Sequence, residues 1–203
     1  PYTPSTPWVA DKVLVSLSAT HGVEGVYGSG AQVHWLRTQG LQPLPPQTAV
    51  MLVHALNPHG FSWLRRVNED NVDINRNHLD FSRPLPSNPD YEAIHALVVP
   101  AQLHAQTLQD IHAQLQAHIA RVGLSAATRA ITGGQYVHAD GLFYGGRQLC
   151  WSNRMLNAVV AAHLTHARAL CVLDHHTGLG PHAHSELICR HPVGSPALQH
   201  ARD

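Results

Sequence analysis

The sequence has little charge and no bias of sign. It contains one lysine and four glutamates among 203 residues, and its 13 basic and 13 acidic residues give a formal net charge of zero. No basic block is present, so nucleic acid is not an expected partner. No apolar run approaches the roughly eighteen residues of a membrane span. Residues 1–7 also lack the charged and apolar regions of a signal peptide, so we expect no signal peptide in this sequence and no membrane span.

Cysteine is also scarce. Cys150, Cys171 and Cys189 have no regular spacing and form no CxxC pair, which excludes a zinc ribbon and a disulfide framework and favours a reducing compartment, the cytoplasm. Histidine, in contrast, occurs 18 times, and it is the commonest metal ligand. Most of the histidines, such as His112 and His118, lie in predicted helices, where we expect solvated side chains. Composition alone therefore does not predict a metal site.

Three short runs rich in valine and leucine predict buried strands. They span residues 12–19, 48–56 and 169–173. A helix predicted at residues 29–39 lies between the first two strands, and a strand–helix–strand unit builds a parallel sheet. A further helix is predicted at residues 153–168, with Ser152 as its N-cap. We therefore expect an α/β fold, with a mixed, largely parallel twisted sheet between helices, in one domain over residues 1–203.

The other segments alternate between loops and helices. Residues 61–89, dense in Asn, Asp, Pro and Arg, predict a long loop, and such loops are more often functional than idle. An apolar stripe predicts an amphipathic helix over residues 108–122. A short strand is expected at residues 130–131. The glycine-rich loop after it, residues 133–147, lacks the spacing of a phosphate-binding loop and is expected to line a cleft.

Two of the predicted strands end in histidine-bearing turns. His21 and Glu24 follow the first strand, and His176 follows the third in a turn that also holds Asp174 and His175. Because ligands bind beyond the carboxyl ends of parallel strands, both turns would face one crevice. Two histidines and one glutamate form a known catalytic zinc set that leaves a position for water. The alternatives are that His21 caps the following helix, and that Asp174 or His175 takes the place of His176.

The long loop carries Arg65, Arg66 and Arg76. Arginine recognises carboxylates through two parallel hydrogen bonds, so these residues are candidates for binding a substrate carboxylate. A salt bridge to an acidic residue of the same loop, such as Asp73, is the commoner fate of an arginine. The spacing alone favours that structural role.

Together these motifs resemble the zinc carboxypeptidase superfamily, which includes aspartoacylase-type deacylases, and they look closest to a bacterial branch of it. The resemblance covers residues 12–188. The matching motifs stand in the family's order, at residues 21–25, 57–60, 66–68, 73–77 and 174–178. The match rests on the order of these short motifs as much as on any one of them.

The resemblance implies a role for individual residues. Its zinc ligands would be His21, Glu24 and His176. Asp174 would orient a ligand or close the strand end. Arg66 would stabilise the oxyanion that develops on the substrate, and Asn75 and Arg76 would hold the free carboxylate of the substrate. His175 occupies a position that is usually apolar, so it should not bind zinc.

The family's general base, a glutamate on a later strand, has no counterpart in this sequence. Glu186 is the one glutamate after His176, and it lies too close to the ligand turn for that role. We therefore expect a chain truncated at its C-terminal end. Its sheet would then have an exposed edge that pairs, forms an oligomer or aggregates.

The function implied by the resemblance is a zinc-dependent hydrolase of peptide or amide bonds, in which zinc-activated water attacks a carbonyl near a substrate carboxylate. The substrate would be a peptide. The same site residues equally allow deacylation of an N-acyl amino acid. A different class, a non-catalytic histidine-rich protein, would bind several ions through clusters of His175, His176, His182 and His184.

Overall fold

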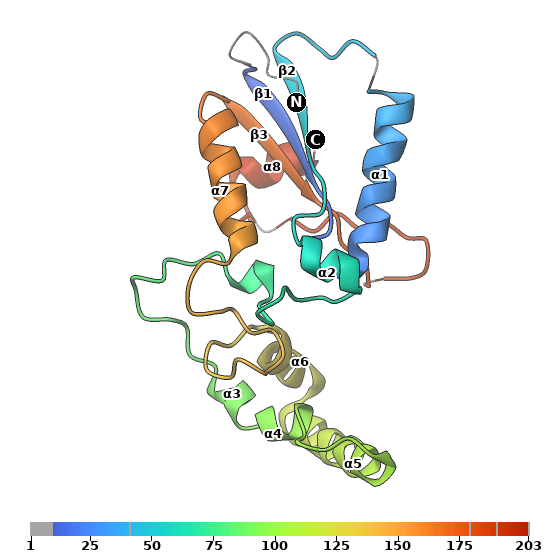
Figure 1. Cartoon of the computed structure of the whole chain (residues 1–203), viewed down its shortest axis with the longest axis vertical. Coiled ribbons are helices and arrows are strands. Elements are labelled where there is room, and N and C mark those ends of the chain that lie inside the picture. The colour runs from blue at the N-terminus through green and yellow to red at the C-terminus, as the bar shows by residue number, and fades with distance from the viewer. Residues whose placement is uncertain (1–9, 41, 179, 190, 203) are drawn as a thin grey trace.

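The computed structural model describes residues 10–40, 42–178, 180–189 and 191–202, and it has an α/β fold (Figure 1). Three strands, β1 (Lys12–Leu17), β2 (Thr48–Val53) and β3 (Ala169–Asp174), form an open sheet in the order β2-β1-β3. Both strand pairings are parallel. The predicted α/β class and its parallel strands are therefore confirmed, and every strand pairing among the described residues is parallel.

The middle strand, β1, forms the buried centre of the sheet. Val13, Val15 and Leu17 are 2%, 3% and 6% exposed, and they pack with Ala49 of β2 and with Leu164. The prediction that residues 169–173 are buried is wrong, because all of them are exposed. Within the described residues β3 pairs with β1 alone, so it forms an edge of the sheet.

Helix α1 (Gly25–Thr38) and helix α7 (Trp151–His163) flank the sheet (Figure 1). Helix α1 begins four residues before the predicted start because its first turn lies against the end of β1. A Cβ on Gly28 would come within 2.8 Å of the Ser18 Cβ. Gln32, one turn later, is buried and donates to the carbonyl oxygens of Ser16 and Val53. Helix α1 is therefore held against the ends of β1 and β2 by close packing and by these hydrogen bonds.

Helix α7 has Cys150 as its N-cap residue, so the prediction of Ser152 as the cap is wrong. The Oδ1 atom of Asn77 accepts a hydrogen bond of 2.8 Å from the Cys150 N–H, which fixes where the helix begins. Ser152 is buried in the first turn. The helix ends at His163, before the predicted residue 168.

A second group of helices lies on the far side of the strand ends (Figure 1). It comprises α3 (Pro89–Glu92), α4 (His95–Val98), α5 (Ala105–Val122) and α6 (Leu124–Thr132). Helix α5 confirms the helix predicted over residues 108–122. The strand predicted at residues 130–131 is wrong, because these residues form the last turn of α6. Ala127 and Ala130, three residues apart, are buried on one face of that helix, which is a helical period.

Buried amide side chains hold the long loops in place. The region 61–89 is mostly loop, as predicted, between the end of α2 (Pro58–Trp63) and α3, with one short helix, η2 (Ile74–Arg76). Asn77 is fully buried, and its amide donates to the carbonyl oxygens of Gly145 and Gln148 at 2.8 Å. These bonds join this loop to the glycine-rich loop, residues 133–147.

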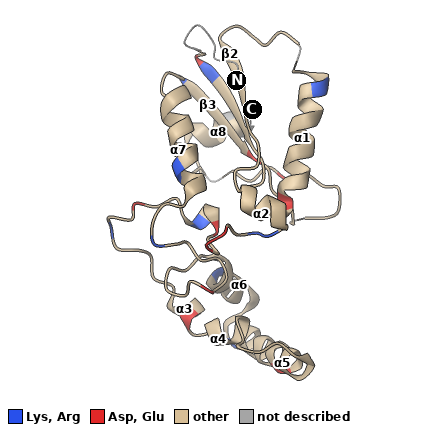
Figure 2. Cartoon of the chain, in the orientation of Figure 1, with Lys and Arg blue, Asp and Glu red and all other residues tan. Residues whose placement is uncertain are grey.

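Charged residues of both signs are thinly spread over the elements, and in the described part of the chain no helix or strand carries a continuous basic run (Figure 2). The last described element is α8 (Pro196–Arg202). None of the helices in the described ranges combines the length and the hydropathy needed to cross a membrane.

Candidate metal centre

The candidate site lies where β1 and β3 end. Because the two strands are parallel and paired from Lys12 to Leu17, their carboxyl ends emerge at the same edge of the sheet. The hydroxyl of Thr20 donates to Asp174 Oδ1 at 2.7 Å and ties the two turns together. The short helix η1 (Gly22–Glu24) follows at once and returns Glu24 to the strand ends.

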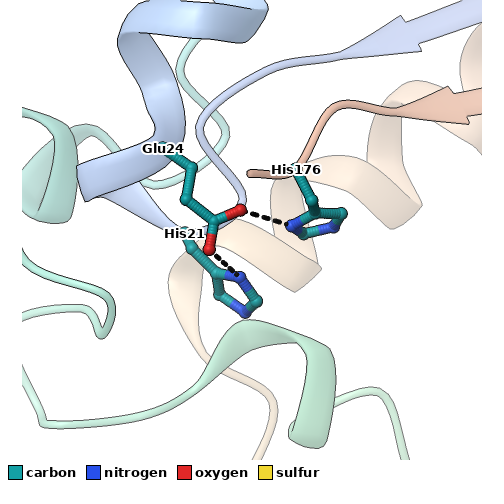
Figure 3. A group of neighbouring side chains, drawn as sticks. All are labelled: His21, Glu24 and His176. Carbon is teal, nitrogen blue, oxygen red and sulfur yellow. Dashed lines mark hydrogen bonds and ion pairs between the residues drawn. The ribbon is translucent and has the colours of Figure 1, made fainter. Parts of the chain in front are cut away.

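His21, Glu24 and His176 meet at this edge (Figure 3). Nδ1 of His21 lies 3.1 Å from Glu24 Oε1, and Nδ1 of His176 lies 2.9 Å from Glu24 Oε2. The two imidazole rings are 4.8 Å apart at their centroids, with an interplanar angle of 51°. The three predicted ligands therefore present their ligand atoms to one another, and all these atoms lie within 4.8 Å.

The far nitrogen of each imidazole faces a carboxylate. Nε2 of His21 lies 3.3 Å from Asp73 Oδ1, and Nε2 of His176 lies 2.8 Å from Asp174 Oδ2. A histidine that binds a metal through one nitrogen usually donates its other N–H to a carboxylate, which fixes the ring and its tautomer. This arrangement leaves Nδ1 of both rings for a metal, on the side of Glu24.

Burial and hydrogen bonding shift the pKa values of His21, Glu24 and His176. Hydrogen bonds with Asp174 and Glu24 raise the pKa of His176 to about 9. Burial disfavours the charged form of His21, but hydrogen bonds with Asp73 and Glu24 outweigh it and raise the pKa of His21. Burial likewise opposes the Glu24 carboxylate, yet bonds from His176, His21 and the Thr177 N–H hold the pKa of Glu24 well below its ordinary value. The carboxylates thus stay ionised and favour positive charge between them.

Zinc fits this set of side chains. Zinc binds histidine nitrogen and carboxylate oxygen at about 2.0–2.2 Å in a tetrahedron, which separates neighbouring ligand atoms by about 3.4 Å. The Glu24 oxygens lie 3.1 and 2.9 Å from the two Nδ1 atoms. Since all three ligand atoms lie within 4.8 Å of one another, these side chains are close enough to converge on one ion.

Arg66 lies at the same centre. Its Nε donates to Asp73 Oδ2 at 2.9 Å, and its Nη1 lies 3.7 Å from Glu24 Oε1. The expected salt bridge to a loop carboxylate is thus present, but its partner, Asp73, is fully buried. The Arg66 side chain remains 35% exposed, and its guanidinium stacks on the Phe143 ring at 4.6 Å.

Asn75 and Arg76, the predicted carboxylate binders, lie beside the centre. Asn75 is exposed, and its Nδ2 is 3.5 Å from His176 Nε2. Arg76 is turned toward the end of α6, where Nε and Nη2 donate to the Thr132 carbonyl oxygen at 3.1 and 2.8 Å. Its guanidinium also lies 5.6 Å from the Phe143 ring. Part of its hydrogen-bonding capacity is therefore used within the chain.

The neighbouring histidines lie apart from this group. Nε2 of His175 is 3.0 Å from Ser16 Oγ, and His175 is not part of the group formed by the three ligands. Among the described residues, His182 and His184 belong to no group of potential metal ligands. Glu186 is exposed and makes no hydrogen bond or ion pair with another described residue.

Two residues of the centre were not singled out by the sequence. The sequence marks Asp73 as a salt-bridge partner and as the first residue of the 73–77 motif, but it does not indicate that Asp73 holds His21, Arg66 and the Asn75 N–H together. Phe143 lies under two arginines and adopts a positive φ of 50°. No sequence pattern marks Phe143 as part of the site, because the glycine-rich loop has no period. Its strained backbone conformation is visible only in the fold.

Comparison with known proteins gives one family. A model described as "Protein of unknown function (DUF2817)" matches residues 6–203. No curated protein and no solved structure matches the chain.

Proposed function

The chain belongs to the DUF2817 family, and on the geometry of its metal centre we propose that it is a zinc-dependent hydrolase of peptide or amide bonds, similar to the zinc carboxypeptidases. One observation carries the proposal. Two imidazoles turn Nδ1 toward one glutamate while Nε2 of each meets a separate carboxylate. A purely structural cluster has no need of two such oriented rings, whereas a metal site does.

The side chains divide the work of such a hydrolase. When bound, zinc would activate a water molecule and polarise the substrate carbonyl. His21, Glu24 and His176 would hold the ion. Asp73 and Asp174 would fix the two rings by accepting from Nε2, and each Nδ1 would release its proton as the metal binds.

Arg66 is suited to the negative charge that develops on the substrate. Its guanidinium is held by Asp73 and by the Phe143 face, so it is oriented before the substrate binds. Donors fixed in advance stabilise a developing oxyanion without reorganisation. The exposed amide of Asn75 and the Arg76 guanidinium next to it would bind a substrate carboxylate. A peptide C-terminus or an N-acyl amino acid offers such a group.

The order of the motifs supports the same assignment. The ligand turns follow the first and third strands, as in the zinc carboxypeptidase pattern, and the arginine-bearing loop lies between them. This likeness rests on the sequence motifs and on the parallel sheet that carries them.

We also propose the cytoplasm as the compartment of the protein. All three cysteines are free, with Cys150 buried and Cys171 and Cys189 exposed. Exposed thiols persist in a reducing environment.

The test is hydrolysis by zinc-loaded protein of a panel of N-blocked dipeptides and N-acyl amino acids, followed by detection of the released amino acid. We expect slow release, because the chain has no glutamate that matches the family's general base, and a general base contributes roughly 100- to 10,000-fold. The release should stop on chelation and in Glu24→Gln. The members of the panel that react separate peptidase from deacylase. The absence of chelator-sensitive release from every member would contradict the proposal.

A further inference from the structure

A second group of potential ligands lies in the helical part of the protein. His95 of α4 meets His138 and Asp140 of the glycine-rich loop, and the ligand atoms of these three side chains lie within 4.8 Å of one another. None of them belongs to the centre at the strand ends. The ring centroids of His95 and His138 are 3.7 Å apart, and Nε2 of His95 is 3.6 Å from Asp140 Oδ1.

The ring of His95 is oriented by the buried side chain of Tyr91. Tyr91 is fully buried, and its hydroxyl oxygen accepts a hydrogen bond of 2.7 Å from the Leu142 N–H. The same hydroxyl lies 3.4 Å from His95 Nδ1, so it can also accept the Nδ1 proton. This leaves Nε2 of His95 as the ligand atom, and that atom faces Asp140.

The loop residues are held by a rigid turn. The side chain of Gln135, 1% exposed, accepts from the N–H groups of Val137 and His138 and donates to the His138 carbonyl oxygen. The Gly141 N–H also bonds that carbonyl. The backbone that carries His138 and Asp140 is therefore fixed before any ion binds, which lowers the entropy cost of binding.

We propose that His95, His138 and Asp140 form a second site, for a divalent transition ion of the zinc class. Imidazole and carboxylate ligands suit zinc, nickel and copper, and the site would complete its shell with water. The two rings are stacked and nearly parallel, at 14°, so their lone pairs lie in separate parallel planes and do not converge on one ion. Binding therefore opens the stack through a rotation about χ2 of His138, a torsion with a broad minimum. The ion would link α4 to the loop that carries Phe143.

The test is the number of zinc ions that the chelator-stripped full chain binds after equilibrium dialysis against zinc chloride, measured by elemental mass spectrometry. We expect two ions for the wild type and for the control His112→Ala, whose residue is exposed on α5. We expect one ion for His138→Ala and one for His21→Ala. One ion in the wild type, or two in His138→Ala, would overturn the proposal.

Asp140→Asn provides a second variant that is safe for the fold, because the Asp140 side chain is 75% exposed. In competition with a chromophoric chelator in the His21→Ala background, we expect its remaining zinc site to weaken at least 10-fold. Unchanged affinity would overturn the role of Asp140. Since this background lacks a ligand of the strand-end centre, the result is independent of the proposed hydrolase function.

Discussion

Replacement of Asp73 by asparagine tests how the buried carboxylate supports the proposed metal centre. Burial alone would raise the pKa of Asp73, but hydrogen bonds and charge from His21 and Arg66 lower it from an ordinary value of 3.8 to about 2. At about 1.4 kcal/mol per pKa unit, this lowering corresponds to roughly 2 kcal/mol of folding free energy. Asparagine keeps the shape, but its NH2 group would face a donor of His21 or Arg66. We therefore expect Asp73→Asn to lose about 3 kcal/mol at pH 7.

The measurement is urea unfolding of the chelator-stripped protein. Because the folded-state pKa is lowered, the contribution of Asp73 is complete well above pH 3.8 and is lost as the pH falls toward about 2. The difference between wild type and variant should therefore shrink below about pH 4. The control is Asp70→Asn in the same loop, where the residue is exposed and a change within about 0.5 kcal/mol is expected.

The same variant should weaken zinc binding at the strand-end centre by about 10- to 100-fold, since Asp73 fixes His21 through Nε2. Competition with a chromophoric chelator measures this in the His138→Ala background. A variant with full stability and full zinc affinity would refute the reasoning that Asp73 orients the ligand.

Two further substitutions test the packing that supports the site. Gly22→Ala should abolish folding or cost more than about 4 kcal/mol, because its Cβ would lie 1.8 Å from the Gly60 carbonyl carbon. Its control is Gly30→Ala, where a Cβ meets nothing within 4 Å and the change should be neutral or stabilise by up to about 1 kcal/mol. Equal thermal unfolding of the two variants would show that Gly22 is not required for close packing against Gly60. Asn77→Ala should cost about 3–5 kcal/mol in urea unfolding, because it leaves the buried Gly145 and Cys150 backbone groups without partners. Asn157→Ala, exposed on α7, is its control, and a similar small effect in both would show that the Asn77 bonds do not support the loop.

The sequence predicted those parts of the site that depend on local pattern. The valine- and leucine-rich runs define the strands, and parallel pairing then brings their ends together. For that reason the turns that hold His21, Glu24 and His176 could be expected to meet before the fold was known, whereas the choice of His176 over Asp174 and His175 came from the family resemblance. The exposed state of β3 could not be predicted, since an apolar run reads the same at the edge of a sheet as at its centre.

The supporting residues could not be predicted because they act across long sequence separations. Asp73 reaches His21 from a loop without period, 52 residues away. The start of α7 depends on the side-chain amide of Asn77, which is 73 residues from Cys150. The local preference of Ser152 for a cap position therefore predicted the wrong N-cap residue. The second histidine group depends on a stack between α4 and the glycine-rich loop, which no local spacing encodes.

The most direct test of the central claim is a crystal structure of the zinc-loaded protein with data collected at the zinc absorption edge. We expect an anomalous peak within about 2.0–2.2 Å of Nδ1 of His21, Nδ1 of His176 and a Glu24 carboxylate oxygen. Asp73 and Asp174 should remain on the two Nε2 atoms. The absence of a peak at the strand ends, or an ion bound through Nε2 with those carboxylates displaced, would show that these side chains do not form the proposed zinc site.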